Sequence, residues 1–219
     1  NFALFYLLKN NTKKGMIKMK ERKVVFTESI ELNRVYFKDC MVGMKGIPDQ
    51  SVDAIICDLP FGTTGHHWDT IIPIDELWAE YNRIIKPEGN IILFSIEPFS
   101  TKLKAANLEN LRYEYIWDKR VGANFKSCHT QPLRQHEIIS VFKSPNVGKI
   151  RDIFYFPQNL KRVNKKMKVR GESYLGHEIT NEGKEYVQEF TNYPKSILHY
   201  DRDEEKIHPT QKPVALLEY

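Results

Sequence analysis

The chain has 219 residues, 41% hydrophobic and 12% aromatic, which is enough for one large domain or two small ones around a sizeable core. Its 33 Lys and Arg outnumber 28 Asp and Glu, and this charge of +5 permits nucleic-acid binding without demonstrating it. The three isolated cysteines support neither a disulfide framework nor a zinc knuckle, and they favour a reducing, cytoplasmic setting.

Residues 1–23 are basic and poorly patterned, and we interpret them as a loosely held N-terminal arm. The apolar run from Phe2 to Leu8 is too short to span a bilayer. Basic residues follow this run instead of preceding it, which is the wrong order for a signal peptide. No association with a membrane is therefore expected.

Short runs rich in β-branched and aromatic residues predict five strands, at 34–38, 52–57, 90–95, 113–117 and 137–142. Apolar residues at the helical period predict helices over about 75–86 and 99–108, and 41–47 suggests a short helical turn. Pro87 to Gly89 should stop the first of these helices, and Ser100 is the expected cap of the second. Strands that alternate with helices are the pattern of an open, wound α/β sheet.

The strand at 52–57 leads directly into Asp58-Leu59-Pro60-Phe61-Gly62. Pro60 cannot donate to a sheet ladder, so the strand should end near Asp58. Ligands of open α/β sheets bind beyond the carboxyl ends of the strands, which makes Asp58 and Phe61 candidate site residues. On these residues alone, an ordinary Asp-Pro-Gly turn explains the stretch about equally well. His66 and His67 follow without a third ligand nearby, so no metal site is expected.

The character of the chain changes after Ser144-Pro145, which leaves residues 24–144 as the predicted core. Residues 145–200 are polar and basic with interleaved aromatics, and we interpret them as an insert or small second domain. Within it, residues 161–170 contain six basic residues, which fit either a solvated loop or a surface for phosphates.

Three pieces of sequence together resemble the amino-group DNA methyltransferases of the permuted, beta-type arrangement found in phages and bacteria: Asp58-Leu59-Pro60-Phe61, Trp117-Asp118-Lys119 and His208-Pro209-Thr210-Gln211-Lys212-Pro213. The resemblance runs from about Asn33 to Tyr219. In the family's usual Asp-Pro-Pro-Tyr motif, Leu59 here replaces a proline and Phe61 a tyrosine. The resemblance implies a Rossmann-like α/β sheet, S-adenosylmethionine as cofactor and double-stranded DNA as partner.

The resemblance also implies roles for individual residues. The catalytic segment would be Asp58, Leu59, Pro60 and Phe61. In it, the Asp58 carboxylate and the Leu59 carbonyl would accept hydrogen bonds from the target amine and aim it at the methyl group. Phe61 would stack on a base that has left the duplex. The segment from Arg134 to Glu137 would be mainly structural, holding the catalytic loop.

Binding residues are implied in two further sets. Asp39, at the end of its predicted strand, would lie near the cofactor's adenine and at the same sheet edge as Asp58, and the motif at 208–213 would lie beside the methionine moiety. The cofactor set is therefore Asp39, Cys40, Asp58, His208, Thr210, Gln211 and Lys212. The expected DNA contacts are Lys119, Arg120, Lys126, Lys161, Arg162, Lys165, Lys166, Lys168 and Arg170.

The sequence departs from the family pattern at its C-terminal end. In this arrangement a glycine-rich cofactor loop follows the helix after His208 to Pro213, but the sequence stops at Tyr219 and contains no Gly-x-Gly. We therefore expect an incomplete sheet that lacks the strands of the cofactor loop, with residues 201–219 as the start of the cofactor-binding half. Either the chain is a fragment, or a second polypeptide supplies the loop.

We therefore expect a site-specific DNA methyltransferase that acts on the N6 amine of adenine, because Asp instead of Ser at position 58 favours adenine over cytosine N4. A non-catalytic nucleic-acid-binding module built from a methyltransferase is a second hypothesis, favoured by the missing loop and disfavoured by the intact Asp58. A methyltransferase acting on protein or RNA ranks lower. A restriction endonuclease partner and a homodimer are both compatible with the sequence.

Overall fold

The computed structural model describes residues 31, 33–36, 38–66, 69–169, 183–205, 208 and 210–219. The predicted arm at 1–23 and the candidate residue Arg170 lie outside the described residues. The chain divides into two units, one that runs to Phe154 and resumes from Ser196 to Leu217, and one of Tyr155–Lys195 with Glu218–Tyr219. The second unit is narrower than the predicted insert of 145–200. In the described part of the chain, no helix is long and apolar enough to cross a membrane.

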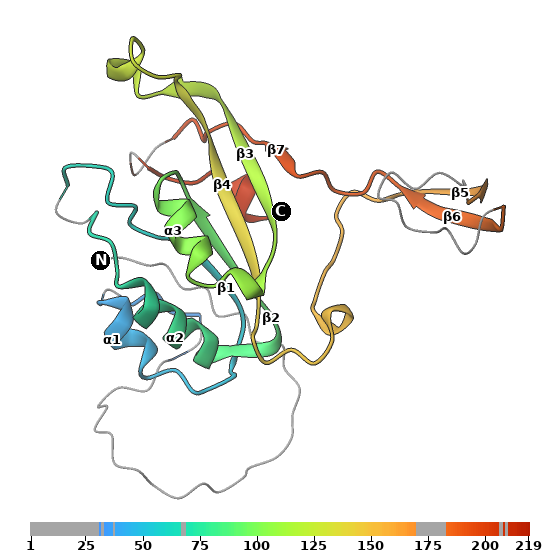
Figure 1. The fold of residues 1–219 in the computed structure, drawn as a ribbon, viewed down its shortest axis with the longest axis horizontal. Helices are drawn as coiled ribbons and strands as arrows, with labels where there is room; N and C mark the ends of the chain where they lie inside the picture. The colour runs from blue at the N-terminus through green and yellow to red at the C-terminus, as the bar shows by residue number, and fades with distance from the viewer. Residues whose placement is uncertain are drawn as a thin grey trace, which may run out of the picture. The chain divides into compact units, whose positions relative to one another are not determined.

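The first unit is built on a mixed, five-stranded sheet in the order β1-β2-β4-β3-β7 (Figure 1). Its strands are β1 Val52–Asp58, β2 Ile85–Ser95, β3 Leu111–Ala123, β4 Arg134–Lys143 and β7 Ile197–His199. β1 runs parallel to β2, whereas β4 runs antiparallel to both β2 and β3, and β7 is parallel to β3. Four of the five predicted strands are confirmed, and β3 and β4 continue beyond their predicted ends as a long hairpin (Figure 1).

The predicted strand at 34–38 is wrong. Residues 34–36 and 38 form no strand, and Asp39 instead caps helix α1, Cys40–Met44. Asp39 Oδ1 accepts hydrogen bonds from the backbone nitrogens of Met41 at 2.9 Å and Val42 at 3.2 Å. A carboxylate at this position satisfies N–H groups that have no partner within the first helical turn. The expectation that Asp39 and Asp58 both end parallel strands therefore fails, because the described residues that lead into Asp39 form no strand.

The remaining helices are α2 Ile74–Ile84, α3 Phe99–Ala105 and the short α4 Val214–Leu217. α2 ends at Ile84, and β2 begins at the next residue, so Pro87 to Gly89 lie within the irregular start of β2 and do not stop the helix. Gly89 is required there, because a Cβ would lie 2.7 Å from the carbonyl oxygen of Asp53. The N-cap of α3 is Pro98, and Ser100 is fully buried inside the helix.

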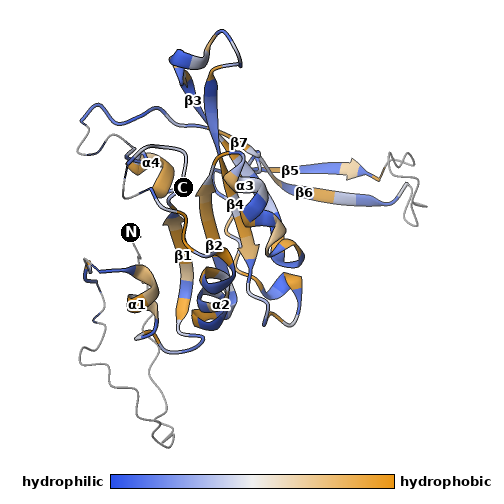
Figure 2. Ribbon diagram, turned by 60° about the vertical axis from the view of Figure 1, so that its left-hand side comes forward, coloured by the Kyte–Doolittle hydropathy of each residue, from blue (hydrophilic) through white to orange (hydrophobic). Residues whose placement is uncertain are grey.

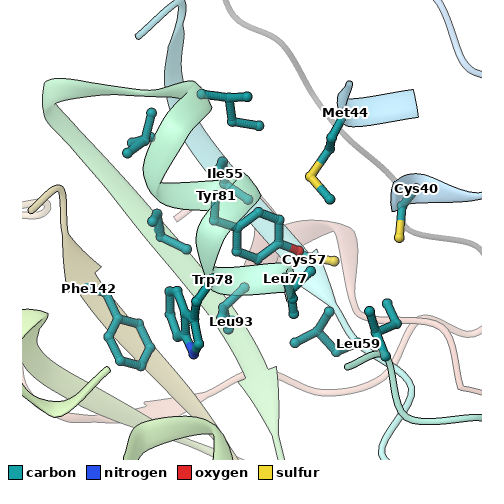
Figure 3. Close-up of a cluster of buried hydrophobic side chains, with 14 of the residues drawn as sticks. Cys40, Met44, Ile55, Cys57, Leu59, Leu77, Trp78, Tyr81, Leu93 and Phe142 are labelled. Atoms are coloured by element: carbon teal, nitrogen blue, oxygen red, sulfur yellow. The ribbon is translucent and has the colours of Figure 1, made fainter. Parts of the chain in front are cut away.

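The core forms where α2 packs on the sheet (Figure 3). Trp78 meets Phe142 of β4 nearly edge to face, with ring centroids 4.6 Å apart, and its indole nitrogen donates to the carbonyl oxygen of Leu103 at 3.3 Å. Tyr81, also from α2, points its hydroxyl at Cys57 in β1 (Figure 3). Burial raises the pKa of Cys57 to about 12, so this thiol stays protonated and acts as a core residue. The strand that ends at Asp58 is thus held rigidly.

The second unit contains a two-stranded antiparallel ribbon of β5 Lys161–Lys168 and β6 Glu185–Thr191 (Figure 1). Most of its side chains are exposed. Figure 2 shows the contrast in hydropathy, because β1 and β2 are largely hydrophobic whereas β5 is mostly hydrophilic. The sequence did not predict these strands, since a ribbon that faces water on both sides needs no alternation of apolar and polar residues.

Candidate active site

β1 delivers Asp58 to the end of the sheet, where the chain leaves the strand. The next residue, Leu59, is buried in the core and fixes the start of the loop. Asp58 Oδ2 lies 2.9 Å from Lys212 Nζ. The other oxygen, Oδ1, is buried, and no donor within the described residues reaches it. Asp58 therefore has one oxygen paired with Lys212 and one buried oxygen without a donor among the described residues.

Lys212 lies just before α4 and joins Asp58 to a second carboxylate. Its ammonium nitrogen is 3.0 Å from Glu137 Oε2 on β4, and Lys119 Nζ on β3 is 3.2 Å from Glu137 Oε1. Two cations and two anions thus alternate, so the charges in this network balance. The side chains of Lys119, Lys212 and Glu137 are 5%, 9% and 13% exposed, whereas that of Asp58 is 36% exposed. The network is closed at one end and opens to solvent at Asp58.

The electrostatics follow from this geometry. Burial raises the pKa of Asp58, and the opposing effect of Lys212 does not cancel it. Burial acts in the same direction on Glu137, but Lys212 and Lys119 together hold the pKa of Glu137 below its usual value. Burial would lower the pKa of Lys212, yet the carboxylates of Asp58 and Glu137 keep it above the usual value. Lys212 therefore stays charged, and Asp58 is a stronger base than an ordinary aspartate.

Aromatic rings surround the Lys212 ammonium. Its nitrogen lies 5.3 Å from the ring centroid of Phe94 and 5.8 Å from that of Phe61. Phe61 packs against Phe99 with 5.7 Å between centroids and 35° between ring planes. Phe61 is half-buried, so part of this residue stays accessible to a ligand.

The loop after Phe61 is clamped by a carboxylate that sequence reasoning missed. Asp69 is buried and accepts from the backbone nitrogens of Gly62 at 2.9 Å, Thr63 at 2.9 Å and Thr64 at 2.7 Å, and from Thr64 Oγ1 at 2.8 Å. Burial would raise the pKa of Asp69, but these hydrogen bonds lower it overall. Asp69 thereby fixes the path of the chain immediately after the predicted catalytic segment.

The predicted cofactor residues do not all converge. His208 lies close enough to Asp58 to oppose slightly the rise in the pKa of that carboxyl, and the Nδ1 of His208 is 3.0 Å from Thr210 Oγ1. The side-chain amide of Gln211 instead donates to Asp203 Oδ2 at 2.9 Å. Cys40 is buried in the same core cluster as Cys57, and burial raises the pKa of its thiol.

The predicted DNA contacts separate into two kinds. Lys119 is buried and ion-paired, so in this structure it belongs to the charge network and not to the surface. Arg120 and Lys126 are exposed on the β3–β4 hairpin, and Arg120 Nη1 lies 3.7 Å from Asp201 Oδ2. The others within the described residues all lie on β5, namely Lys161, Arg162, Lys165, Lys166 and Lys168.

Glu137 is the other functional candidate that sequence reasoning missed as a site residue. The available signal was an acid immediately before the apolar run that forms the buried part of β4, a position where a charge needs a partner. For Asp69 the corresponding signal was an acid at the end of a loop rich in Gly and Thr, whose backbone N–H groups need acceptors.

Comparisons with known proteins identify a family model and solved structures similar to this chain. A family model described as DNA methylase of the N6/N4 type matches residues 52–219. Among solved structures, PvuII DNA methyltransferase (cytosine-N4-specific) is similar, with a TM-score of 0.53 and 11% identity over 84% of this chain and 67% of that chain. M1.HpyAVI, solved as a complex with SAM, gives a TM-score of 0.46 and 19% identity over 84% of this chain and 72% of that chain. No curated protein matches the sequence.

Proposed function

The chain belongs to the N6/N4 DNA methylase family, and from this premise we propose that it transfers the methyl group of S-adenosylmethionine to the N6 amine of adenine at a specific site in double-stranded DNA. The observation that carries the proposal is the Asp58 carboxylate, whose Oδ2 is held by Lys212 while its buried Oδ1 has no donor among the described residues. A buried acceptor without a partner is costly unless a ligand supplies the donor.

Asp58 suits the chemistry of an exocyclic amine. Such an amine is a weak nucleophile, because its lone pair is delocalised into the base. Hydrogen bonds from the amine to Asp58 Oδ1 and to the Leu59 carbonyl oxygen would localise the lone pair and direct it. The carboxylate also stabilises the positive charge that develops on the nitrogen, and its raised pKa makes it a better acceptor than an ordinary aspartate. Lys212 keeps the carboxylate in one orientation throughout.

The surroundings of Asp58 fit a cationic methyl donor. S-adenosylmethionine supplies a methyl group on a positively charged sulfonium. Aromatic faces and a carboxylate are the groups that attract such a cation, and Phe61, Phe94 and Asp58 provide them here. From the resemblance, His208, Thr210 and Lys212 would hold the methionine part and Asp39 the adenine part, whereas the Gln211 amide is already bonded to Asp203.

Adenine is proposed over cytosine because the residue at position 58 is Asp. Cytosine N4 is the alternative, since the fold is similar to that of a cytosine-N4-specific enzyme, and the two bases present chemically similar exocyclic amines. A cytoplasmic location, a restriction endonuclease partner and a homodimer stay predictions.

The test is to incubate the chain with S-adenosylmethionine and double-stranded DNA and to identify the methylated nucleoside by mass spectrometry. We expect N6-methyladenine. Asp58→Asn keeps the shape of the side chain but removes its charge, so it should abolish transfer and leave DNA affinity nearly unchanged. Asp49→Asn is the control, because this carboxylate is 75% exposed and pairs with Arg83 away from the site.

Each other outcome is informative. N4-methylcytosine as the product would overturn the choice of base. DNA binding without any transfer would favour the non-catalytic module. DNA affinity that falls together with activity in Asp58→Asn would contradict the assignment of this residue to the amine.

A further inference from the structure

The register of the β5–β6 ribbon divides its side chains between two faces. Residues directly opposite each other in an antiparallel pair point to the same side, and side chains alternate along each strand. One face therefore carries three cross-strand pairs, Arg162 with Phe190, Lys165 with Gln188 and Met167 with Tyr186. We call these six residues the aromatic face.

The opposite face carries the pairs Lys161 with Thr191, Lys166 with Val187 and Lys168 with Glu185. Glu189 shares this side by its position on β6, facing a bulge in which Asn164 has a φ of 47°. Lys168 Nζ is 3.5 Å from Glu185 Oε1, so part of its charge is already neutralised. We call this side the mixed face.

The two faces differ in charge pattern as well as in composition. The aromatic face combines two cations with two aromatic rings and contains no acid, and neither Arg162 nor Lys165 has an ion pair within the described residues. The mixed face holds three cations and two acids. The basic residues of 161–168, which look like a uniform run in the sequence, are therefore divided by β5 between two faces of different composition.

We propose that the aromatic face is the surface that enters the major groove of duplex DNA, an inference that rests on the proposed function. A two-stranded ribbon is one of the few elements that the major groove admits. At about 3.3 Å a residue, the eight residues of β5 span roughly 26 Å, enough to follow the groove along part of a turn. Arg162 and Lys165 contact phosphates, and Tyr186 faces the base edges.

The instability of an isolated ribbon supports a partner on this surface. A two-stranded hairpin is at best marginally stable in water. Tyr186 is nevertheless 48% exposed, and the cations beside it repel each other in the absence of counter-charge. Phosphates relieve this repulsion and release their own condensed cations, which is why such contacts make affinity depend on salt.

The experiment compares matched pairs of substitutions on the two faces of the whole chain. Arg162→Gln with Lys165→Gln should flatten the plot of log affinity for duplex DNA against log salt by about 1.8, since each phosphate contact contributes roughly 0.9. Lys166→Gln with Lys168→Gln removes the same charge from the mixed face and should change the slope by less than about 0.9, one contact. All four side chains are exposed, so thermal melting should be unchanged in both variants.

A second pair tests the face without changing charge. Tyr186→Ala should weaken DNA binding, whereas Val187→Ala, the next residue on β6 with a similar exposure of 53%, should not. The same measurements on duplex RNA should show no difference between the faces, because the major groove of A-form RNA is too deep and narrow to admit a ribbon.

Slopes that change equally for both pairs, or for neither, would overturn the proposal. A difference between the faces on duplex RNA as large as that on duplex DNA would overturn it too. Methyl transfer is measured on the same preparations. If methyl transfer occurs but DNA binding responds equally to substitutions on the two faces, the ribbon inference alone is overturned. Face-dependent DNA binding without transfer overturns the proposed function alone, and absence of DNA binding by the unmodified chain overturns both.

Discussion

The ammonium of Lys212 lies 2.9 Å from Asp58 and 3.0 Å from Glu137, so a residue near the end of the sequence sits between the carboxylates of two strands. The resemblance to amino-group methyltransferases places Lys212 beside the cofactor. The ion pairs give it a further role, because Lys212 fixes the orientation of Asp58 and keeps the buried site electrically balanced. Glu137 in turn is the residue that allows two lysines to be buried here.

The first prediction concerns Glu137 and Lys119. Glu137→Gln leaves the buried ammonium of Lys119 without a carboxylate, and breaking a buried pair in this way costs about 3–5 kcal/mol. The free energy of unfolding, measured in urea, should fall by that amount. Lys119→Met should also destabilise, but the double variant should lose much less than the sum, since no unpaired charge remains between these two positions.

Glu114→Gln is the matched control for this cycle. Glu114 forms a comparable ion pair with Lys104 at 3.1 Å but is 43% exposed, so its loss should cost no more than about 1 kcal/mol. Additive losses for Lys119 and Glu137 would contradict the buried network.

The second prediction is the pH dependence of the same site. The folded-state pKa of Glu137 lies below 4.5, so its ionised form contributes stability that is fully present above pH 4.5 and is lost as the pH falls through the folded value. The folded-state pKa of Asp58 lies above 3.8, so its contribution is present below pH 3.8 and is lost as the pH rises. The free energy of unfolding should be measured from pH 7 to pH 3. The difference in this free energy between wild type and Glu137→Gln should decrease as the pH falls. Asp58→Asn should instead lose stability relative to wild type as the pH falls. Profiles of stability against pH that run parallel for the variants and the wild type would contradict these pKa shifts.

The central strands and α2 could be predicted because buried elements have apolar residues at a regular spacing in the sequence. The stripe of Leu77, Trp78, Tyr81 and Ile84 recurs at the helical period, and all four residues are buried in the structure. Asp58 was found for a related reason, since a buried strand that meets a proline must end and its terminal carboxylate is exposed to ligands.

Other features leave no local pattern. Val35 lies in the wrongly predicted strand and is 57% exposed. β propensity reflects packing against neighbouring strands, so a run of suitable residues does not by itself make a strand. The contact between Glu137 and Lys212 joins residues far apart in sequence, and periodicity carries no information about such a pair. Lys165 and Lys166 adjoin in sequence but lie on opposite faces of the ribbon, because side chains alternate along β5, a strand that the sequence did not predict.

The third prediction concerns the ring of Phe61. Phe61→Ala should weaken capture of an extrahelical base by about 1–3 kcal/mol, the usual value of one base–aromatic stack. A fluorescent adenine analogue at the target position would report this loss as a smaller change in emission on binding. Phe61→Tyr keeps the stacking face and should keep the signal. An unchanged signal in Phe61→Ala would contradict the stacking role.

The last prediction compares two glycines of the loop that follows the catalytic segment. Gly62 has a φ of +67°, and a Cβ there would lie 2.7 Å from Ile71 Cγ1, whereas a Cβ at Gly65 would meet nothing within 4 Å. The Ile71 side chain can move, but the left-handed backbone at Gly62 costs an L-residue about 1–2 kcal/mol. Gly62→Ala should therefore shift the backbone, lengthen the hydrogen bond from Gly62 N to Asp69 Oδ1 and displace the adjoining Phe61.

The measured result should be a lower melting temperature and a lower rate of methyl transfer for Gly62→Ala, with both unchanged for Gly65→Ala. The affinity for duplex DNA, apart from the contribution of the extrahelical base, should be the same in the two variants, because neither substitution changes a charge. Asp69→Asn, which removes the charge that holds the loop, should reproduce the effect on rate without backbone strain. If Gly62→Ala transfers methyl groups as fast as Gly65→Ala, the conformation fixed by Asp69 is not what positions Phe61 beside Asp58.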